Sequence, residues 1–119
     1  MRKWRIDDSR DLYNIRGWGI NYFDINEKGH ATVSPLKSKG PSIDLYELLQ
    51  ELAIRDVSTP MLLRFPEILD NRSEKINECC SKSIKEYNVN GTYYNVFPIK
   101  VNQRRAVLEE VVRHGKKFD

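Results

Sequence analysis

Tyr93-Tyr94-Asn95-Val96-Phe97-Pro98-Ile99-Lys100 is a run of mostly aromatic and β-branched residues that brings one lysine to its end. This composition predicts a strand that is buried on both faces. Pro98 lacks an N–H group, so we expect the sheet hydrogen bonds to end at Phe97 or to be interrupted there by a bulge. Lys100 would then lie at the mouth of the strand. Because an ammonium group is costly to remove from water, Lys100 must reach solvent, bind an anion or lose its proton.

The chemistry open to Lys100 depends on which of these outcomes holds. Most lysines at strand ends are solvated surface residues, and spacing alone favours that interpretation. A lysine that loses its proton is a nucleophile that condenses with aldehydes, including pyridoxal phosphate, which can then withdraw electrons from the α-carbon of an amino acid. The residues by themselves leave both interpretations open.

The first third of the chain predicts a β-hairpin between an arm and a linker. Residues 20–25 and 31–34 are short β-prone runs, and the turn Asn26-Glu27-Lys28-Gly29 joins them with a glycine where a positive φ is needed. Residues 1–16 have few periodic apolar positions, which indicates an extended arm or short turns. Residues 35–41 are rich in proline, lysine and serine and predict a linker. We therefore place a first domain portion at residues 1–41.

The remaining residues, 42–119, alternate between predicted strands and helices. Asp44 and Glu47 form a pattern like a capping box, and a leucine stripe follows at helical spacing. We expect these elements: a helix that begins near Asp44, a strand at 60–66, a helix from residue 70 or 71 to 87, a strand at 93–99 and a helix from residue 102 or 103 to 114. The order strand, helix, strand, helix is typical of parallel sheets with right-handed crossovers and predicts an α/β fold.

Composition limits the class of protein. Charged residues make up 31% and apolar residues 39% of the chain, as in soluble globular domains. The net charge of +3 is mild, and Glu109 and Glu110 interrupt the basic residues near the end, so we expect no nucleic-acid partner. No apolar run approaches the roughly 20 residues of a membrane span, and no signal peptide is evident, so we expect a cytoplasmic protein with no membrane partner. Cys79 and Cys80 are expected to be reduced thiols, and His30 a structural residue rather than a metal ligand.

Val96-Phe97-Pro98-Ile99-Lys100-Val101-Asn102-Gln103 resembles the cofactor-lysine motif of biosynthetic arginine decarboxylases. Other stretches resemble landmarks of the same family, in order and at suitable spacing: Tyr13-Asn14-Ile15, Gly17-Trp18-Gly19, Tyr22-Phe23-Asp24-Ile25-Asn26 with Gly29-His30, Ile43-Asp44-Leu45, and Leu62-Leu63-Arg64-Phe65-Pro66-Glu67-Ile68-Leu69. The resemblance extends over nearly the whole chain, which makes it more specific than a lone lysine motif.

The resemblance implies a pyridoxal-phosphate enzyme of the alanine-racemase-like fold, in which a (β/α)8 barrel carries the cofactor beside a separate β domain. Lys100 would hold pyridoxal phosphate as a Schiff base, and the hairpin would belong to the β domain. The implied reaction is decarboxylation of L-arginine to agmatine, which leads into polyamine and spermidine synthesis. The resemblance also implies a homo-oligomer and a requirement for magnesium, for which the sequence offers no cluster of carboxylates.

The length of the chain restricts what the resemblance can imply. A complete β/α barrel takes about 250 residues, so only its first two strand–helix units would be covered. We therefore expect an incomplete amino-terminal portion that is inactive alone. Two alternatives stay open: a non-catalytic protein that binds pyridoxal phosphate, and a small α+β interaction module in which Lys100 is a surface charge. Arg64, near the end of the first predicted strand, is expected to have only a structural or phosphate-directed role.

Overall fold

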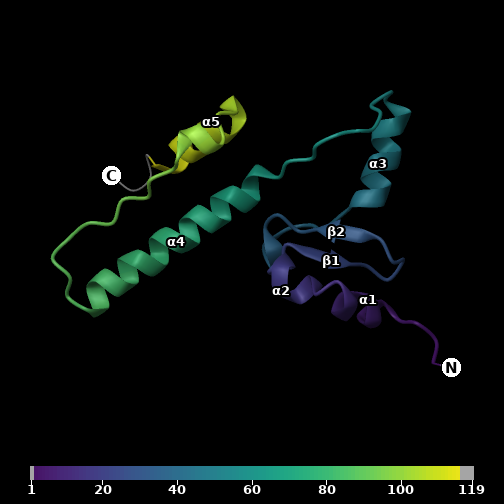
Figure 1. The fold of residues 1–119 in the computed structure, drawn as a ribbon, viewed down its shortest axis with the longest axis horizontal. Helices are drawn as coiled ribbons and strands as arrows, with labels where there is room; N and C mark the ends of the chain where they lie inside the picture. The colour runs from purple at the N-terminus through teal and green to yellow at the C-terminus, as the bar shows by residue number, and fades with distance from the viewer. Residues whose placement is uncertain (1, 116–119) are drawn as a thin grey trace. The chain divides into compact units, whose positions relative to one another are not determined.

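The structure, a computed structural model, describes residues 2–115 and divides into two compact units, Met1–Arg64 and Phe65–Asp119 (Figure 1). The predicted boundary between residues 41 and 42 stays a prediction. Within the described range, no helix combines the length and the apolar character that a bilayer crossing requires.

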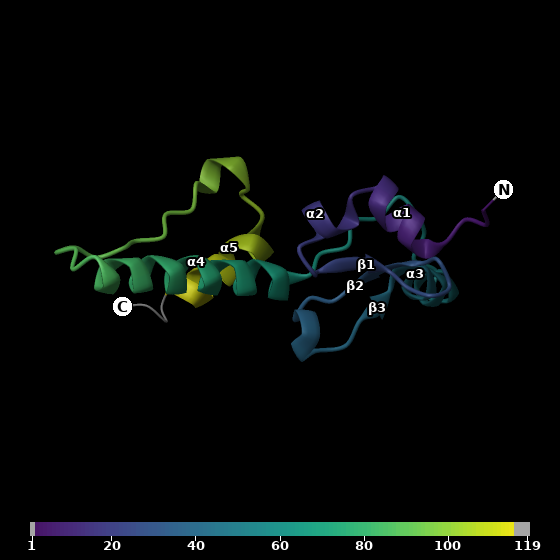
Figure 2. The same cartoon turned by 90° about the horizontal axis from the view of Figure 1, so that it is seen from below.

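The first unit is built on a three-stranded antiparallel sheet. Its strands are β1 (Phe23–Ile25), β2 (Ala31–Val33) and β3 (Ile43–Asp44), hydrogen-bonded in the order β1-β2-β3 (Figure 2). Phe23 lies opposite Val33 in the β1–β2 pair, which confirms the predicted hairpin. Gly29 in the connecting turn has a φ of 82°, a backbone conformation that favours glycine.

A small core lies beneath this sheet. Its buried side chains include Ile15, Tyr22 and Val33, and Val33 on the central strand is completely buried. Val33 lies opposite Phe23 on one side and Ile43 on the other. The sheet therefore depends on one central side chain for much of its packing.

The amino-terminal segment is helical where the sequence predicts an extended arm or short turns. The helices α1 (Ile6–Leu12) and α2 (Ile15–Gly19) contact β1 and lie on one side of the sheet (Figure 2). Asp8 in the first turn of α1 accepts a hydrogen bond from the Arg5 backbone N–H at 2.8 Å. This contact lowers the pKa of Asp8 and satisfies a donor at the start of the helix, so capping decides the structure here rather than apolar periodicity.

The predicted linker and the helix after it are present in the first unit. Residues 35–41 contain a single 3₁₀ turn, η1 (Lys37–Lys39), and helix α3 (Leu45–Ile54) begins directly after β3. The Asp44 side chain accepts hydrogen bonds from the backbone N–H groups of Tyr46 and Glu47. This confirms Asp44 as the residue that caps the helix.

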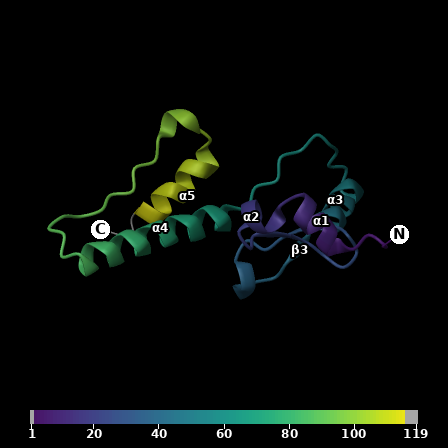
Figure 3. The ribbon, with the colours of Figure 1, turned by 60° about the horizontal axis from the view of Figure 1, so that its bottom comes forward.

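The second unit consists of helices α4 (Pro66–Glu86) and α5 (Arg105–Gly115), which pack against each other (Figure 3). A segment without regular structure joins them and includes the 3₁₀ turn η2 (Ile99–Val101). Helix α4 begins at Pro66, about one turn before the predicted start. A proline at the first helical position loses no intrahelical hydrogen bond, so Pro66 starts this helix instead of ending the preceding segment.

The two predicted buried strands, 60–66 and 93–99, are wrong for the described chain. Residues 61–65 and 92–98 have no regular secondary structure, and side chains such as Tyr94 and Val96 are 77% and 83% exposed. A strand that is buried on both faces needs hydrogen-bonded neighbours and covering helices, which local composition cannot provide. The described chain is therefore α/β in the coarse sense that it combines helices with a small antiparallel sheet.

Candidate functional site

Lys100, the residue that the sequence singles out, lies in the short turn η2 and not at the end of a strand. The turn is closed by hydrogen bonds from Val101 N to the Pro98 carbonyl at 3.0 Å and from Asn102 N to the Ile99 carbonyl at 3.1 Å. Lys100 is exposed. Within the part of the chain that the structure describes, its ammonium makes no ion pair. The amine is therefore accessible to a ligand.

The segment before Lys100 is attached to the second unit by some of its aromatic residues. Tyr93 and Phe97 are half-buried, whereas Tyr94 and Val96 are exposed. Burial raises the pKa of the Tyr93 phenol, and the nearby Cys80 thiol on α4 adds to this rise. The segment is thus held at Tyr93 and leaves several apolar side chains near Lys100 facing solvent.

The cysteines and His30 agree with the sequence predictions. Cys79 and Cys80 are free thiols. His30 Nδ1 lies 2.8 Å from Asp44 Oδ2, so His30 is a hydrogen-bonded structural residue. Asn26 Nδ2 donates to the same oxygen at 2.7 Å. Among the side chains that the structure describes, which end at Arg113, no group of acidic, histidine and cysteine residues gathers to form a metal site.

Asp44 is the centre of this network. Its burial acts to raise the pKa of the carboxyl, but the hydrogen bonds from His30, the Glu47 backbone and Asn26 outweigh that effect and lower the pKa to about 2. The carboxylate therefore joins the hairpin turn to the first turn of α3. This is a structural role.

A cavity that the sequence does not predict lies in the first unit. It is partly open to solvent and has a volume of about 500 Å³, and we call it the first-unit cavity. Its lining includes Arg10, Ile15, Arg16, Asn21, Tyr22, Phe23, Asp24, Ser34, Lys37 and Ser38. The residues come from helices α1 and α2, strand β1 and the segment after β2. Cations, hydroxyl groups and aromatic rings are thus brought together from positions that are far apart in the sequence.

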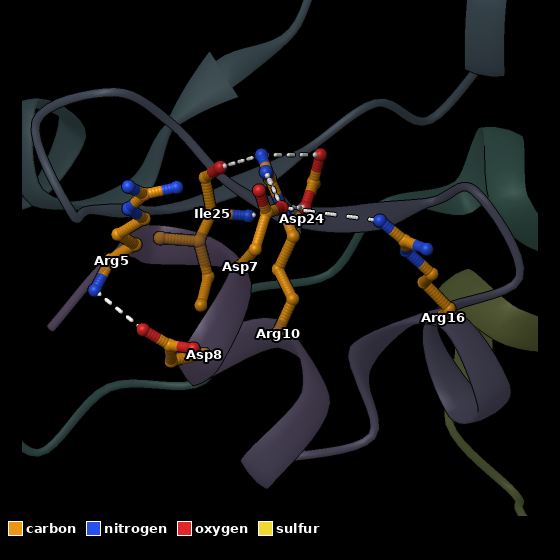
Figure 4. Close-up of polar contacts among 7 residues, drawn as sticks. All are labelled: Arg5, Asp7, Asp8, Arg10, Arg16, Asp24 and Ile25. Atoms are coloured by element: carbon orange, nitrogen blue, oxygen red, sulfur yellow. Dashed lines mark hydrogen bonds and ion pairs between the residues drawn. The ribbon is translucent and has the colours of Figure 1, made fainter. Parts of the chain in front are cut away.

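Arg10 organises one wall of this cavity (Figure 4). Its Nε lies 2.7 Å from Asp24 Oδ1, its Nη2 donates to the Ile25 carbonyl at 2.6 Å, and its Nη1 lies 2.9 Å from Asp7 Oδ1. Burial acts to raise the pKa of Asp24, but the hydrogen bonds from Arg10 and the Ile25 backbone, together with the charges of Arg10 and Arg16, outweigh it and lower the pKa. The same contact with Asp24 raises the pKa of Arg10. Arg10 is therefore an internally paired cation.

Arg16 and Lys37 are the less strongly paired cations of the cavity. Arg16 Nη2 lies 3.9 Å from Asp7 Oδ1, and its side chain is 78% exposed (Figure 4). Lys37 Nζ lies 4.4 Å from the centre of the Tyr22 ring, a cation–π contact that leaves its charge in place. These two side chains hold positive charge that is available to a ligand.

Sequence comparison then places the chain among known proteins. No family model matches it. Over all 119 residues it is 56% identical to the biosynthetic arginine decarboxylase of Phocaeicola vulgatus and 55% identical to that of Bacteroides thetaiotaomicron. Over 113 residues it is 51% identical to that of Thermosynechococcus vestitus. The chain is a homologue of the amino-terminal portion of biosynthetic arginine decarboxylases. The predicted family resemblance is thereby confirmed.

The match covers the whole chain but only part of each decarboxylase. The chain spans 19% of the length of the Phocaeicola and Bacteroides arginine decarboxylases. Most of the sequence of these arginine decarboxylases therefore has no counterpart in the 119 residues. The activity that these names state therefore belongs to the full-length relatives.

Proposed function

We propose that this chain supplies the cofactor-holding lysine, Lys100, of an enzyme that converts L-arginine to agmatine and carbon dioxide for polyamine and spermidine synthesis. The observation that carries the proposal is the 55–56% identity over all 119 residues to proteins named biosynthetic arginine decarboxylase. The resemblance of residues 96–103 to the cofactor-lysine motif of that family supports the choice of Lys100.

The residues around Lys100 fit one part of pyridoxal phosphate, its aldehyde. Lys100 offers an exposed primary amine next to exposed apolar side chains, Ile99 and Val101. When bound, pyridoxal phosphate supplies an aldehyde that condenses with amines and a ring that accepts electrons from the bond to the departing carboxylate. Groups for the cofactor's phosphate and ring nitrogen belong, in this proposal, to the remaining length of the decarboxylase.

Lys100 would hold the cofactor covalently through its side-chain amine, and the same nitrogen would lose and regain a proton. The amine must lose its proton to act as a nucleophile, and burial of its exposed apolar neighbours in a complete enzyme would favour the neutral form. The apolar run 93–99 would become a buried strand in the same event. We therefore propose that residues 60–66 and 93–99 form barrel strands only when other strands flank them.

Further properties follow from the family resemblance and are part of the same proposal. The complete protein would be a cytoplasmic homo-oligomer with a (β/α)8 barrel and a β domain, and it would require magnesium in addition to pyridoxal phosphate. L-Arginine is the small-molecule substrate. The 119-residue chain alone would produce no agmatine, because it corresponds to 19% of the length of the Phocaeicola and Bacteroides decarboxylases.

A chimeric enzyme tests this proposal. Residues 1–119 replace the matching segment of the Phocaeicola vulgatus decarboxylase, and agmatine formation from L-arginine is measured with added pyridoxal phosphate and magnesium. We expect the chimera to be active and the Lys100→Ala chimera to fall to background. Lys75→Ala removes another exposed lysine of the second unit, on α4, and is expected to leave the rate unchanged.

Three outcomes have distinct meanings. Full activity of the Lys100→Ala chimera would contradict the role of Lys100. Agmatine production by the purified 119-residue chain would contradict the claim that the chain is inactive alone. A chimera that folds and binds pyridoxal phosphate without forming agmatine would favour the non-catalytic binder instead.

A further inference from the structure

We propose that the first-unit cavity binds a small organic anion, a phosphate or carboxylate group attached to an apolar or aromatic body. This inference concerns a site other than Lys100 and does not depend on the proposed function. It rests on the charges, donors and walls of the cavity, all of which belong to the first unit.

The cavity has an excess of positive charge. The described lining includes the cations Arg10, Arg16 and Lys37 and one carboxylate, Asp24. Arg10 and Asp24 neutralise each other through two contacts, Nε to Oδ1 at 2.7 Å and Nη2 to Oδ2 at 3.2 Å. Asp7 also lies beside these cations, 2.9 Å from Arg10 and 3.9 Å from Arg16, so three cations face two carboxylates. A net positive charge of one remains, carried by Lys37 and the weakly paired Arg16, and it favours an anion.

The remaining walls of the cavity combine hydrogen-bond donors with apolar side chains. Ser34, Ser38 and Asn21 add neutral groups that can donate hydrogen bonds to an oxyanion. Ile15 and Tyr22 are buried and form an apolar floor. A volume of about 500 Å³ is large enough for a small molecule. The combination suits a ligand with a charged end and an apolar end.

Backbone hydrogen bonds hold part of the cavity wall in place. The Tyr22 backbone N–H donates to the Gly19 carbonyl at 2.7 Å, the Ser34 N–H to the Tyr22 carbonyl at 2.7 Å, and the Lys37 N–H to the Ser34 carbonyl at 2.9 Å. Asn21 and Lys37 have φ values of 63° and 54°, in a region that residues other than glycine seldom adopt. Such backbone conformations persist only where the surroundings hold them, and they are concentrated at binding sites.

The charge of the cavity also determines which molecules it disfavours. Agmatine carries two cationic groups and no anionic one, so Arg16 and Lys37 would repel it. The cavity is therefore unsuited to the product of the proposed reaction. A ligand found there would be a small molecule other than agmatine.

Binding is tested on the 119-residue chain by calorimetry and by the fluorescence of Trp18, whose ring centre lies 5.4 Å from that of Phe23 in the cavity wall. The probes are phenyl phosphate, phenylacetate and benzyl alcohol, which share an aromatic ring and differ in the polar group. We expect at least one anionic probe to bind with a dissociation constant of about 1 mM or tighter, and the neutral alcohol to bind much more weakly. The tighter anion identifies the preferred oxyanion.

A matched pair of variants distinguishes anion binding in the cavity from nonspecific attraction of anions to positive surface charge. Lys37→Gln and Lys39→Gln remove the same charge from the same turn, but only Lys37 is among the lining residues. We expect Lys37→Gln and Arg16→Gln each to lower the affinity for the preferred anion about tenfold. Lys39→Gln should change this affinity less than about twofold. Circular dichroism checks that each variant is folded. Equal weakening by the two lysine variants, equal binding of benzyl alcohol, or no binding of either anion would overturn the proposal.

Discussion

Replacing Val33 with alanine tests whether the antiparallel sheet stabilises the first unit. Val33 is 0% exposed and lies on the central strand, opposite Phe23 and Ile43. The change removes two buried methyl groups, each worth about 0.8 kcal/mol in transfer from water. The cavity left behind adds to this loss, so we expect the free energy of unfolding of the first unit to fall by about 2 kcal/mol.

Urea unfolding followed by tryptophan fluorescence measures this change selectively. Trp4 and Trp18, the two tryptophans of the chain, both lie in the first unit. A unit of this size loses about 1 kcal/mol of stability per molar urea, so the midpoint should fall by about 2 M. Val96→Ala makes the same chemical change where the side chain is 83% exposed, and we expect almost no shift. Equal midpoints for the two variants would refute the assignment of Val33 to the core.

Three further changes test the turn and the polar networks of the first unit. Asp44→Asn should destabilise the chain at neutral pH. Because folding lowers the pKa of this carboxyl from 3.8 to about 2, its contribution to stability is present above pH 3.8 and is lost as the pH falls toward 2. Urea unfolding of the original chain and the variant over that range should show the difference in their free energies of unfolding shrink. A difference that stays constant with pH would contradict this. Gly29→Ala should lower the free energy of unfolding by roughly 1 kcal/mol, as measured by thermal unfolding, because Gly29 has a φ of 82°. Gly29→Asn should lower it less, since asparagine tolerates this conformation better. Equal losses of stability would argue against backbone strain. Arg10→Gln should raise the pKa of Asp24 toward 3.8, as followed by carbon NMR of its carboxyl, and an unchanged titration would contradict the pairing.

Features with short-range causes could be predicted from the sequence. The hairpin follows from two β-prone runs and a turn with Gly29, and the start of α3 follows from Asp44. Both depend on hydrogen bonds between residues close in the chain. The family resemblance could also be recognised from the sequence, because it depends on contiguous motifs such as residues 96–103.

Features with long-range causes could not be predicted in the same way. The run 93–99 has strand composition, yet composition does not provide a partner strand, and the segment is irregular in the described structure. The first-unit cavity could not be predicted because Arg10, Arg16 and Lys37 have no recognisable spacing in the sequence. Positive φ values at Asn21 and Lys37 help to bring its walls together, and neither residue signals such a conformation strongly enough to predict it.

Reduction and peptide mapping of the chimeric decarboxylase test the role of Lys100 most directly. The enzyme is incubated with pyridoxal phosphate, treated with borohydride to fix any adduct, digested and analysed by mass spectrometry. The account predicts about one modified lysine per chain, and that lysine is Lys100, with exposed Lys75 left unmodified. A saturating modification that lies on another lysine, or labelling of Lys100 no greater than that of Lys75, would contradict it.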